Sequence, residues 1–198
     1  GGYARYSTDA FWMVPHFEKM LYDQALIGRT LLHAWQITAE ERYRQILTET
    51  IDYVRRELEQ PEGGWSSAED ADSEGEEGKF YVWRPEEIVT AIGDADAARL
   101  IEWYGVTPQG NFEGSNILHR PVRGDLIRPP EIEAARAKLF EARSRRVRPG
   151  LDDKVLTEWN ALMCATLAEA GAAMGEQSWI DAAVRNADFL IATLRRED

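Results

Sequence analysis

The sequence is poor in the residues that build disulfides, zinc sites and histidine clusters, with one cysteine and three histidines among 198 residues. The single cysteine, Cys164, excludes an internal disulfide. No Cys-x-x-Cys pair, Walker loop, Gly-x-Gly-x-x-Gly loop or serine-hydrolase elbow is present. We therefore expect no metal site and no cofactor.

Signals for membrane insertion or secretion are also absent. No apolar run is long enough to cross a bilayer, and neither a signal-peptide pattern nor an Asn-x-Ser/Thr sequon occurs. We expect a cytoplasmic protein without a membrane partner. Because the sequence begins at Gly1 without a methionine and ends within a charged pattern, we also expect a longer full-length protein.

The charge balance narrows the range of partners. Lysine and arginine total 23 residues against 35 aspartate and glutamate residues, which gives a formal net charge of -12. Binding to nucleic acid or to an anionic membrane surface requires a basic face, so neither is expected as a main partner. Hydrophobic residues make up 44% of the sequence, which is enough to fill a core.

Residues 20–59 predict a helical hairpin. Residues 20–36 are apolar around most of a helical surface, as in a buried helix, whereas residues 40–59 carry a single apolar stripe. Thr38 and Glu41 have capping-box spacing at the turn between them. Pro61 and the glycines that follow it end this first hairpin.

Residues 158–194 repeat this design. Shifting the first hairpin by 136 positions aligns apolar, small and acidic residues across both helices without a gap. The opening Gly1-Gly2-Tyr3 also resembles Gly63-Gly64-Trp65, which follows the first hairpin. Repeated hairpins imply neighbouring units that share a core.

The segment between the hairpins has a different residue pattern. It predicts short strands at residues 79–83 and 116–119 and a helix that begins at Pro85. Residues 131–146 predict a charged helix with a narrow apolar stripe. We expect this segment to be an elaborated loop of the helical scaffold.

Two loop-to-helix junctions carry the polar groups best suited to chemistry. The first contains His16, Glu18, Lys19 and Asp23, just before and within the first apolar helix. A histidine titrates near neutral pH and suits acid/base work. On a helix that starts near Phe17, Lys19 and Asp23 would instead form a structural i,i+4 pair, and His16 would cap the helix.

The second junction contains Asp152, Asp153 and Lys154, followed by Glu158, Trp159 and Asn160. Paired carboxylates can supply one acid and one base, as glycoside hydrolysis requires. Adjacent aspartates seldom share a site in this way, so we expect one to face a cavity and the other to cap the helix or pair with Lys154.

A third candidate is the acidic run at residues 69–78. Its first positions imitate an EF-hand loop, but the twelfth position is Tyr81, where a bidentate glutamate is required. A solvated acidic loop is the alternative. Trp65 before the run and Tyr81 and Trp83 after it place aromatic faces beside carboxylates, a combination typical of sugar sites.

Several long motifs resemble one known family. They are the opening Gly-Gly-Tyr with Arg5-Tyr6-Ser7, the stretch His16–Ala25, residues 67–83, Tyr104-Gly105-Val106 with residues 110–114, and residues 152–157 with Trp159-Asn160. Together they resemble the thioredoxin-domain-containing family of spermatogenesis-associated proteins and their bacterial relatives. The resemblance extends over nearly the whole sequence.

The resemblance implies a mostly α fold that forms part of an (α/α)6 toroid of helical hairpins, with short β-strands in a long inter-hairpin insertion. Such toroids are similar to six-hairpin glycosidases and to N-acylglucosamine 2-epimerases. The expected divisions are a first hairpin at 1–65, an acidic and aromatic insertion at 66–130, and a charged helix with the second hairpin at 131–198. The family also implies further toroid helices and a thioredoxin-like domain outside this sequence. Because half a toroid would expose its inner helices, self-association of this chain is the alternative.

In such toroids the starts of the inner helices line a central cleft, which favours a carbohydrate substrate and acid/base chemistry by an epimerase, isomerase or glycoside hydrolase. The alternative is a non-catalytic module that binds a glycan or a protein. The residues expected to be catalytic are His16, Glu18, Asp72, Asp152 and Asp153. Those expected to contact the substrate are Trp12, Lys19, Asp23, Trp65, Glu69, Asp70, Tyr81, Trp83, Trp159 and Asn160.

Overall fold

The computed structural model describes residues 1–122 and 126–195. The chain forms two compact units. The helical unit contains Gly1–Arg5, Glu18–Asp70 and Gly150–Asp198, and the insertion unit contains Tyr6–Phe17 and Ala71–Pro149. In the part of the chain that the structure describes, no helix is both long and apolar enough to cross a membrane.

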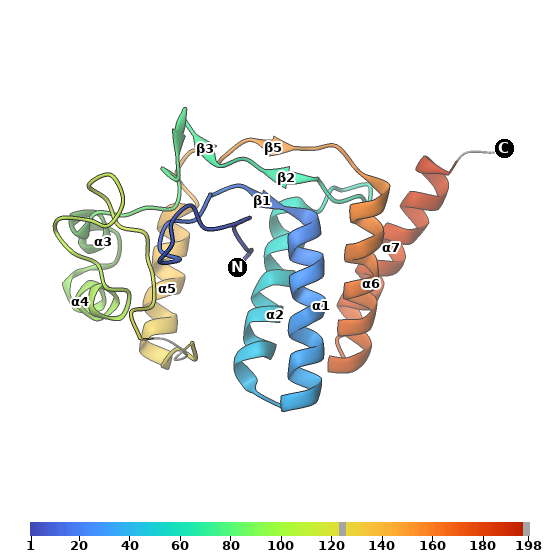
Figure 1. The fold of residues 1–198 in the computed structure, drawn as a ribbon, viewed down its shortest axis with the longest axis horizontal. Helices are drawn as coiled ribbons and strands as arrows, with labels where there is room; N and C mark the ends of the chain where they lie inside the picture. Colours follow the sequence, from blue (N-terminus) through green and yellow to red (C-terminus); the bar gives the residue numbers. More distant parts are fainter. Residues whose placement is uncertain (123–125, 196–198) are drawn as a thin grey trace. The chain divides into compact units, whose positions relative to one another are not determined.

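The helical unit contains the two predicted hairpins. The first consists of α1 (Leu21–Thr38) and α2 (Glu41–Tyr53), which continues into the π-helical turn η1 (Val54–Leu58). The second consists of α6 (Thr157–Met174) and α7 (Gln177–Leu194). The two inner helices, α1 and α6, lie side by side (Figure 1). The prediction of a mostly α fold with helical hairpins is confirmed.

The boundaries of the hairpins repeat as the sequence does. α1 and α6 begin at Leu21 and Thr157, 136 positions apart, and α2 and α7 begin at the same separation. Both inner helices end at a residue in the left-handed conformation, Ala39 (φ 55°) and Gly175 (φ 72°). The first hairpin therefore has an alanine in the left-handed conformation at the position where the second hairpin has a glycine.

An amide side chain in the first turn of each inner helix fastens a Gly-Gly-aromatic segment. Gln24 donates a hydrogen bond to the carbonyl of Tyr3 (2.8 Å) and accepts one from its amide (2.7 Å). Asn160, 136 positions later, donates to the carbonyl of Trp65 (3.0 Å) and accepts from its amide (2.8 Å). We call this arrangement the amide clamp.

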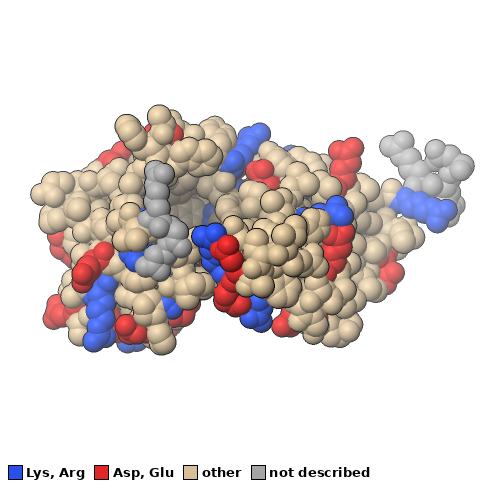
Figure 2. Space-filling model, turned by 60° about the horizontal axis from the view of Figure 1, so that its bottom comes forward, with Lys and Arg blue, Asp and Glu red and all other residues tan. Residues whose placement is uncertain are grey.

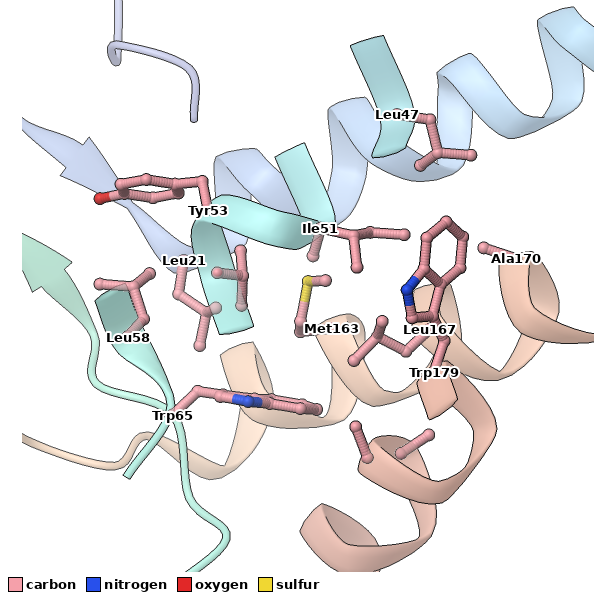
Figure 3. Packing of buried hydrophobic residues seen from close by; sticks show 14 of the residues in the cluster. Leu21, Leu47, Ile51, Tyr53, Leu58, Trp65, Met163, Leu167, Ala170 and Trp179 are labelled. Atoms are coloured by element: carbon pink, nitrogen blue, oxygen red, sulfur yellow. The ribbon is translucent and has the colours of Figure 1, made fainter. Parts of the chain in front are cut away.

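The core of the helical unit lies among these helices. Figure 3 shows Met163 of α6 close to Ile51 of α2 and to Trp65, with Leu167 and Trp179 nearby. All five side chains are buried. The two hairpins thus share one hydrophobic core, as expected for stacked repeats.

A short sheet also belongs to the helical unit. Its strands are β1 (Lys19–Met20), β2 (Ala68–Glu69) and β5 (Leu151–Asp152), in the order β1-β2-β5. Both pairings are antiparallel. The sheet therefore joins the segment that precedes α1 to the segment that precedes α6.

The insertion unit has its own strands, helices and core. Its elements are β3 (Asp72–Ser73), β4 (Glu76–Glu77), α3 (Pro85–Ile92), α4 (Asp94–Trp103) and α5 (Pro130–Arg143). The helix predicted from Pro85 and the charged helix near residue 131 are both present. α5 packs against α3 and α4, whereas the sequence grouped it with the second hairpin.

Three local predictions are wrong. Residues 116–119 do not form a strand, because Asn116 makes only an isolated bridge to Trp83 and the residues after it are irregular. Residues 79–83 form a turn and an isolated bridge instead of a strand, because Nη1 of Arg146 donates to the carbonyls of Lys79, Phe80 and Val82. A side chain thus occupies acceptors that a neighbouring strand would use. The Thr38 capping box does not form either, since Thr38 continues α1 and its hydroxyl donates to the carbonyl of Ala34 (2.7 Å).

The surface carries charges of both signs. On the face drawn in Figure 2, lysine and arginine side chains lie among aspartate and glutamate side chains. The negative net charge is therefore not gathered in a single patch on this face.

Candidate functional site

Residues 6–17 of the insertion unit pair as a short β-hairpin. The amide of Thr8 donates to the carbonyl of Val14 (2.8 Å), and the amide of His16 donates to the carbonyl of Tyr6 (2.8 Å). The rings of Tyr6 and His16 stack, with centroids 4.9 Å apart. This pairing holds the imidazole of His16 against an aromatic face.

A carboxylate orients the same imidazole. Oε1 of Glu77, in β4, lies 2.8 Å from Nδ1 of His16 and also accepts the amide of Phe17 (3.3 Å). Because a carboxylate accepts hydrogen bonds, Nδ1 of the neutral ring carries the proton and Nε2 carries the lone pair. The side chain of His16 is 25% exposed, so solvent reaches the ring. This is the arrangement of a base and its orienting carboxylate.

A cavity of about 510 Å³ lies in the insertion unit, and Glu77 lines it. Its walls come from the β3–β4 hairpin, the residues after β4, the start of α3, the turn at residues 112–115 and the segment after α5. Five glutamates and four basic residues contribute to the lining. Its size and its mixed polar and aromatic lining suit a small polar ligand.

The acidic run is divided between the two units. Asp70 is exposed and belongs to the helical unit, whereas Asp72 is exposed in β3 and pairs in register with Glu77. The run forms a hairpin with a two-residue turn, so it does not wrap around a calcium ion as an EF-hand loop does.

The two aromatic residues after the run have different environments. The ring of Tyr81 stacks on the ring of Phe17, with centroids 5.7 Å apart. Trp83 is 4% exposed, and the guanidinium of Arg146 lies 3.7 Å from its ring centroid. The packing role of Trp83 differs from the ligand contact expected for it.

A polar cluster lies at the start of α1 in the helical unit. Nη1 of Arg5 is 3.1 Å from Oε2 of Glu18, and the hydroxyl of Tyr22 also bonds to Arg5. The ring of Tyr22 packs edge-on against Trp159, with centroids 4.8 Å apart. Two of the predicted residues, Glu18 and Trp159, therefore belong to one cluster through Arg5 and Tyr22.

Asp23 lies in the first turn of α1, beside this cluster. Its Oδ2 is buried and has no hydrogen-bond partner within the described residues. Burial raises the pKa of this carboxyl, and the charge of Glu18 acts in the same direction, against the opposing charge of Arg5. The alternative of a Lys19–Asp23 pair within a helix is wrong, because Lys19 lies in β1, before the helix begins.

The second junction separates the two aspartates. Oδ2 of Asp152 lies 3.0 Å from Nζ of Lys154, and this hydrogen bond lowers the pKa of the Asp152 carboxyl. Asp153 is exposed, and its carbonyl accepts a hydrogen bond from Gln60 (2.7 Å). Asp152 is thus the member of the pair that binds Lys154.

Four residues expected to contact a ligand are buried in the helical unit instead. Trp65 is 1% exposed and belongs to the core, and Asn160 forms its amide clamp. Lys19 lies over the ring of Tyr53 (4.7 Å), and Glu69 accepts the hydroxyl of the same tyrosine (2.9 Å). Their roles in the structure are packing and internal hydrogen bonding.

Trp12 has the opposite character. It lies at the tip of the hairpin of residues 6–17 and is 84% exposed, next to Phe11 at 83%. Its φ of 59° is in the left-handed region, which is unusual for a bulky residue. The carboxylate of Asp9 accepts the amides of Phe11, Met13 and Val14 and so holds this turn in place.

Four residues of these clusters were not indicated by the sequence: Tyr6, Glu77, Arg5 and Tyr22. Glu77 was one of many acids in the run, and nothing in the sequence distinguishes the one that reaches His16. The ten-residue spacing of Tyr6 and His16 about a tight turn could have indicated a hairpin that pairs them.

Comparisons with known proteins give relatives over nearly the whole chain, although no family model matches. The chain is 37% identical to spermatogenesis-associated protein 20 of Homo sapiens over 224 aligned residues, covering 96% of this chain and 28% of that protein. The Mus musculus protein of the same name gives the same identity and coverage. A Caenorhabditis elegans protein is 28% identical over 96% of this chain and 31% of its own length. The chain thus spans less than a third of the relatives' length, and it is similar to spermatogenesis-associated protein 20 along nearly all of its own.

Proposed function

We propose that this chain contributes the acid/base site of a carbohydrate-active enzyme, with His16 as the proton-transfer group and Glu77 as its positioning residue. The observation that carries the proposal is the 2.8 Å contact between Nδ1 of His16 and Glu77, a residue that also lines the cavity of the insertion unit. The reaction class is epimerisation or isomerisation of a sugar, with glycoside hydrolysis as the other acid/base reaction that carboxylates here could serve.

The chemistry of the pair follows from its geometry. Nε2 of the neutral imidazole takes a proton from a sugar carbon next to a carbonyl or from a hydroxyl. The Glu77 carboxylate stabilises the imidazolium that forms and keeps the ring in one tautomer. Stacking on Tyr6 limits rotation of the ring. A proton held on Nε2 can then return to the substrate.

We further propose that the helical unit is part of an (α/α)6 toroid. The repeat of both hairpins at 136 positions, including the amide clamps, supports an array built from equivalent hairpins. The cluster of Arg5, Glu18 and Tyr22 lies at the start of an inner helix, where such toroids bind substrate.

Proton exchange tests the catalytic proposal directly. The full-length protein is incubated in D₂O with a panel of aldoses, ketoses and N-acylated amino sugars, and deuterium incorporation is followed by NMR; aryl glycosides test hydrolysis. We expect His16→Gln to lower turnover by about 100-fold or more, the range for loss of a general base. Glu77→Gln should lower kcat less than His16→Gln does, because the base remains and only the group that orients it is weakened.

His33→Gln is the matched control, because His33 is an exposed histidine that contacts Glu169 (3.5 Å) in the helical unit. If His16→Gln turns over a substrate of the wild-type protein at an unchanged rate, the enzymatic proposal is contradicted.

A non-catalytic binding module is the second candidate. It is favoured by Phe11 and Trp12, which the hairpin tip presents almost fully to solvent. In that case Trp12→Ala abolishes glycan or protein binding, whereas no sugar in the panel exchanges a proton.

A further inference from the structure

The cavity of the insertion unit is built from fixed walls. Nη1 of Arg146 bonds to three carbonyls of residues 79–82, its guanidinium stacks on Trp83, and Nη2 lies 3.5 Å from Glu87. On the other side, the hydroxyl of Ser73 donates to the carbonyl of Val147 (2.6 Å). These contacts tie β3 and the residues after β4 to the segment after α5, so the cavity is preformed.

Two lining residues adopt an unfavourable backbone conformation. Glu74 has a φ of 55° and Glu113 a φ of 48°, and each precedes a glycine that also has a positive φ. Both pairs form tight two-residue turns, between β3 and β4 and between Phe112 and Ser115. Such turns prefer asparagine, aspartate or glycine at the first position. Glutamates there place carboxylates on the cavity wall at a cost in backbone strain.

Most charges of the lining are already paired. Lys79 binds Glu76 (2.7 Å) and Glu74 (3.5 Å), Arg145 binds Glu141 outside the cavity (3.1 Å), and Glu77 holds His16. Within the described residues, no ion pair joins Glu113 or Arg84 to a partner. The carboxylate of Glu113 and the guanidinium of Arg84 are therefore available to bind a ligand.

The opposite charges of these two groups favour a neutral ligand that both donates and accepts hydrogen bonds. A sugar hydroxyl donates to a carboxylate and accepts from a guanidinium. The half-buried ring of Phe112, which also lines the cavity, supplies an apolar face for the carbon side of a sugar ring. A free amino acid is the competing ligand, since its ammonium and carboxylate groups match the same pair of charges.

We propose that this cavity is the binding site for an uncharged mono- or disaccharide, with Glu113 and Arg84 as specificity-determining residues and Phe112 as the stacking face. The assignment rests on the proposed function, because it names the binding subsite that would present the sugar to His16 and Glu77. It adds the substrate class: a polyol without phosphate or carboxylate groups.

Calorimetric titration of the full-length protein tests it, with glucose, N-acetylglucosamine, cellobiose and trehalose as probes and with glucose 6-phosphate, glucuronate and arginine as charged competitors. For the neutral sugar that binds, we expect Kd to rise about tenfold in Glu113→Gln and in Arg84→Met, as for loss of a charge-assisted hydrogen bond. Glu102→Gln and Arg195→Met, at exposed positions outside the cavity lining, should leave Kd unchanged.

Glu113→Gly separates binding from folding. It relieves the left-handed strain, so the protein should be at least as stable as the wild type while it loses sugar affinity. A purely structural Glu113 would not give that combination.

Several results overturn the inference. They are failure of every neutral sugar to bind the wild-type protein, unchanged Kd in both cavity variants, or a stronger response to arginine or a sugar acid. The catalytic proposal can fail or survive separately. If His16→Gln loses turnover but the cavity variants bind sugar as the wild type does, only the assignment of the cavity as the sugar site is rejected. If His16→Gln keeps wild-type turnover but Glu113→Gln loses sugar binding, only the catalytic role of His16 is rejected.

Discussion

At the scale of single residues, one amide side chain joins elements that are distant in the sequence. Asn160 bonds both backbone groups of Trp65, donates to the carbonyl of Leu156 (3.1 Å) and accepts from Asn186 (2.9 Å), and it is fully buried. A buried side chain that bonds to four polar groups cannot be shortened without leaving some of them unpaired.

Asn160→Ala should therefore lower the free energy of unfolding by about 3 kcal/mol, as for a broken buried hydrogen-bond network. Urea unfolding followed by tryptophan fluorescence measures it. Gln36→Ala, at an exposed position of α1, is the control and should change stability by less than about 0.5 kcal/mol. Equal effects for the two variants would show that the clamp adds nothing to stability.

Asp23 should make stability depend on pH. Its raised pKa means that the folded state holds the proton more tightly than the unfolded chain, so stability falls as pH rises above the ordinary value of 3.8. Asp23→Asn removes this charge. The variant should match the wild type near pH 4 and exceed it at pH 7 by about 0.5 kcal/mol. The value is small because Asp23 as a whole is only partly buried, so solvent screens part of the interaction.

Thermal unfolding across this pH range checks the sign. Asp52→Asn, at an exposed position of α2, is the comparison. A difference between wild type and Asp23→Asn that shrinks as pH rises would contradict the environment described for Asp23.

Residue types alone indicated His16, but not its partner. A histidine before an apolar helix is visible in the sequence, whereas the approach of Glu77 depends on how two turns fold back on each other. Burial was harder still to predict. Trp65 and Asn160 looked like site residues because polar and aromatic groups at helix starts serve binding and packing alike.

At the scale of elements, the two Gly-Gly pairs are explained by close packing against the outer helices. A Cβ on Gly2 would lie 2.5 Å from the ring of Tyr53, and one on Gly64 would lie 3.0 Å from the ring of Phe189. Tyr53 and Phe189 are themselves separated by 136 positions. The repeat therefore includes the connecting segments, and each glycine makes room for an aromatic ring of the following hairpin.

Gly64→Ala should destabilise the helical unit by about 2 kcal/mol, because the new methyl group also meets Val155 at 2.8 Å. Gly150→Ala is the matched control, since its Cβ would make only ordinary contacts at 3.8 Å. Circular dichroism at 222 nm during thermal unfolding measures both. A Gly64→Ala protein as stable as Gly150→Ala would mean that Phe189 and Val155 move aside without cost.

Helices were easier to predict than strands, for a physical reason. The hairpins depend on local periodicity, which is written in each segment. The stretch after Gly78 had the aromatic and β-branched residues of a strand, yet a strand also needs a partner. Arg146, 64 or more residues away, supplies hydrogen bonds to that stretch in place of one.

At the scale of the whole molecule, the repeat indicates which surfaces can pack against the exposed faces of the inner helices. Thr166 and Glu169 of α6 contact α1: the hydroxyl of Thr166 donates to the carbonyl of Ala25 (3.0 Å), and Glu169 binds Arg29. Leu162 of α6 packs against the core of the helical unit. The equivalent residues of α1 are Leu26, Thr30 and His33, and all three are exposed. The surface of α1 that is equivalent to the contact surface of α6 is therefore exposed to solvent.

The complementary face is uncovered on α6. Ala25 of α1 accepts Thr166, and its equivalent on α6 is Ala161, which is exposed. One copy of the chain can therefore offer Leu26 and Thr30 to Ala161 of another. Because the two faces are different patches, such contacts are head-to-tail and are not limited to dimers.

We expect the 198-residue chain to self-associate with increasing concentration, as measured by sedimentation velocity. Leu26→Arg and Ala161→Arg each block one face, so each variant alone should be monomeric, whereas an equimolar mixture should form a heterodimer through the two intact faces. Val184→Arg, at a position of α7 that is 54% exposed, is the control and should associate like the wild type. A wild-type chain that stays monomeric with a sharp unfolding transition would contradict this expectation, and a mixture that stays monomeric would show that association does not follow the geometry of the repeat.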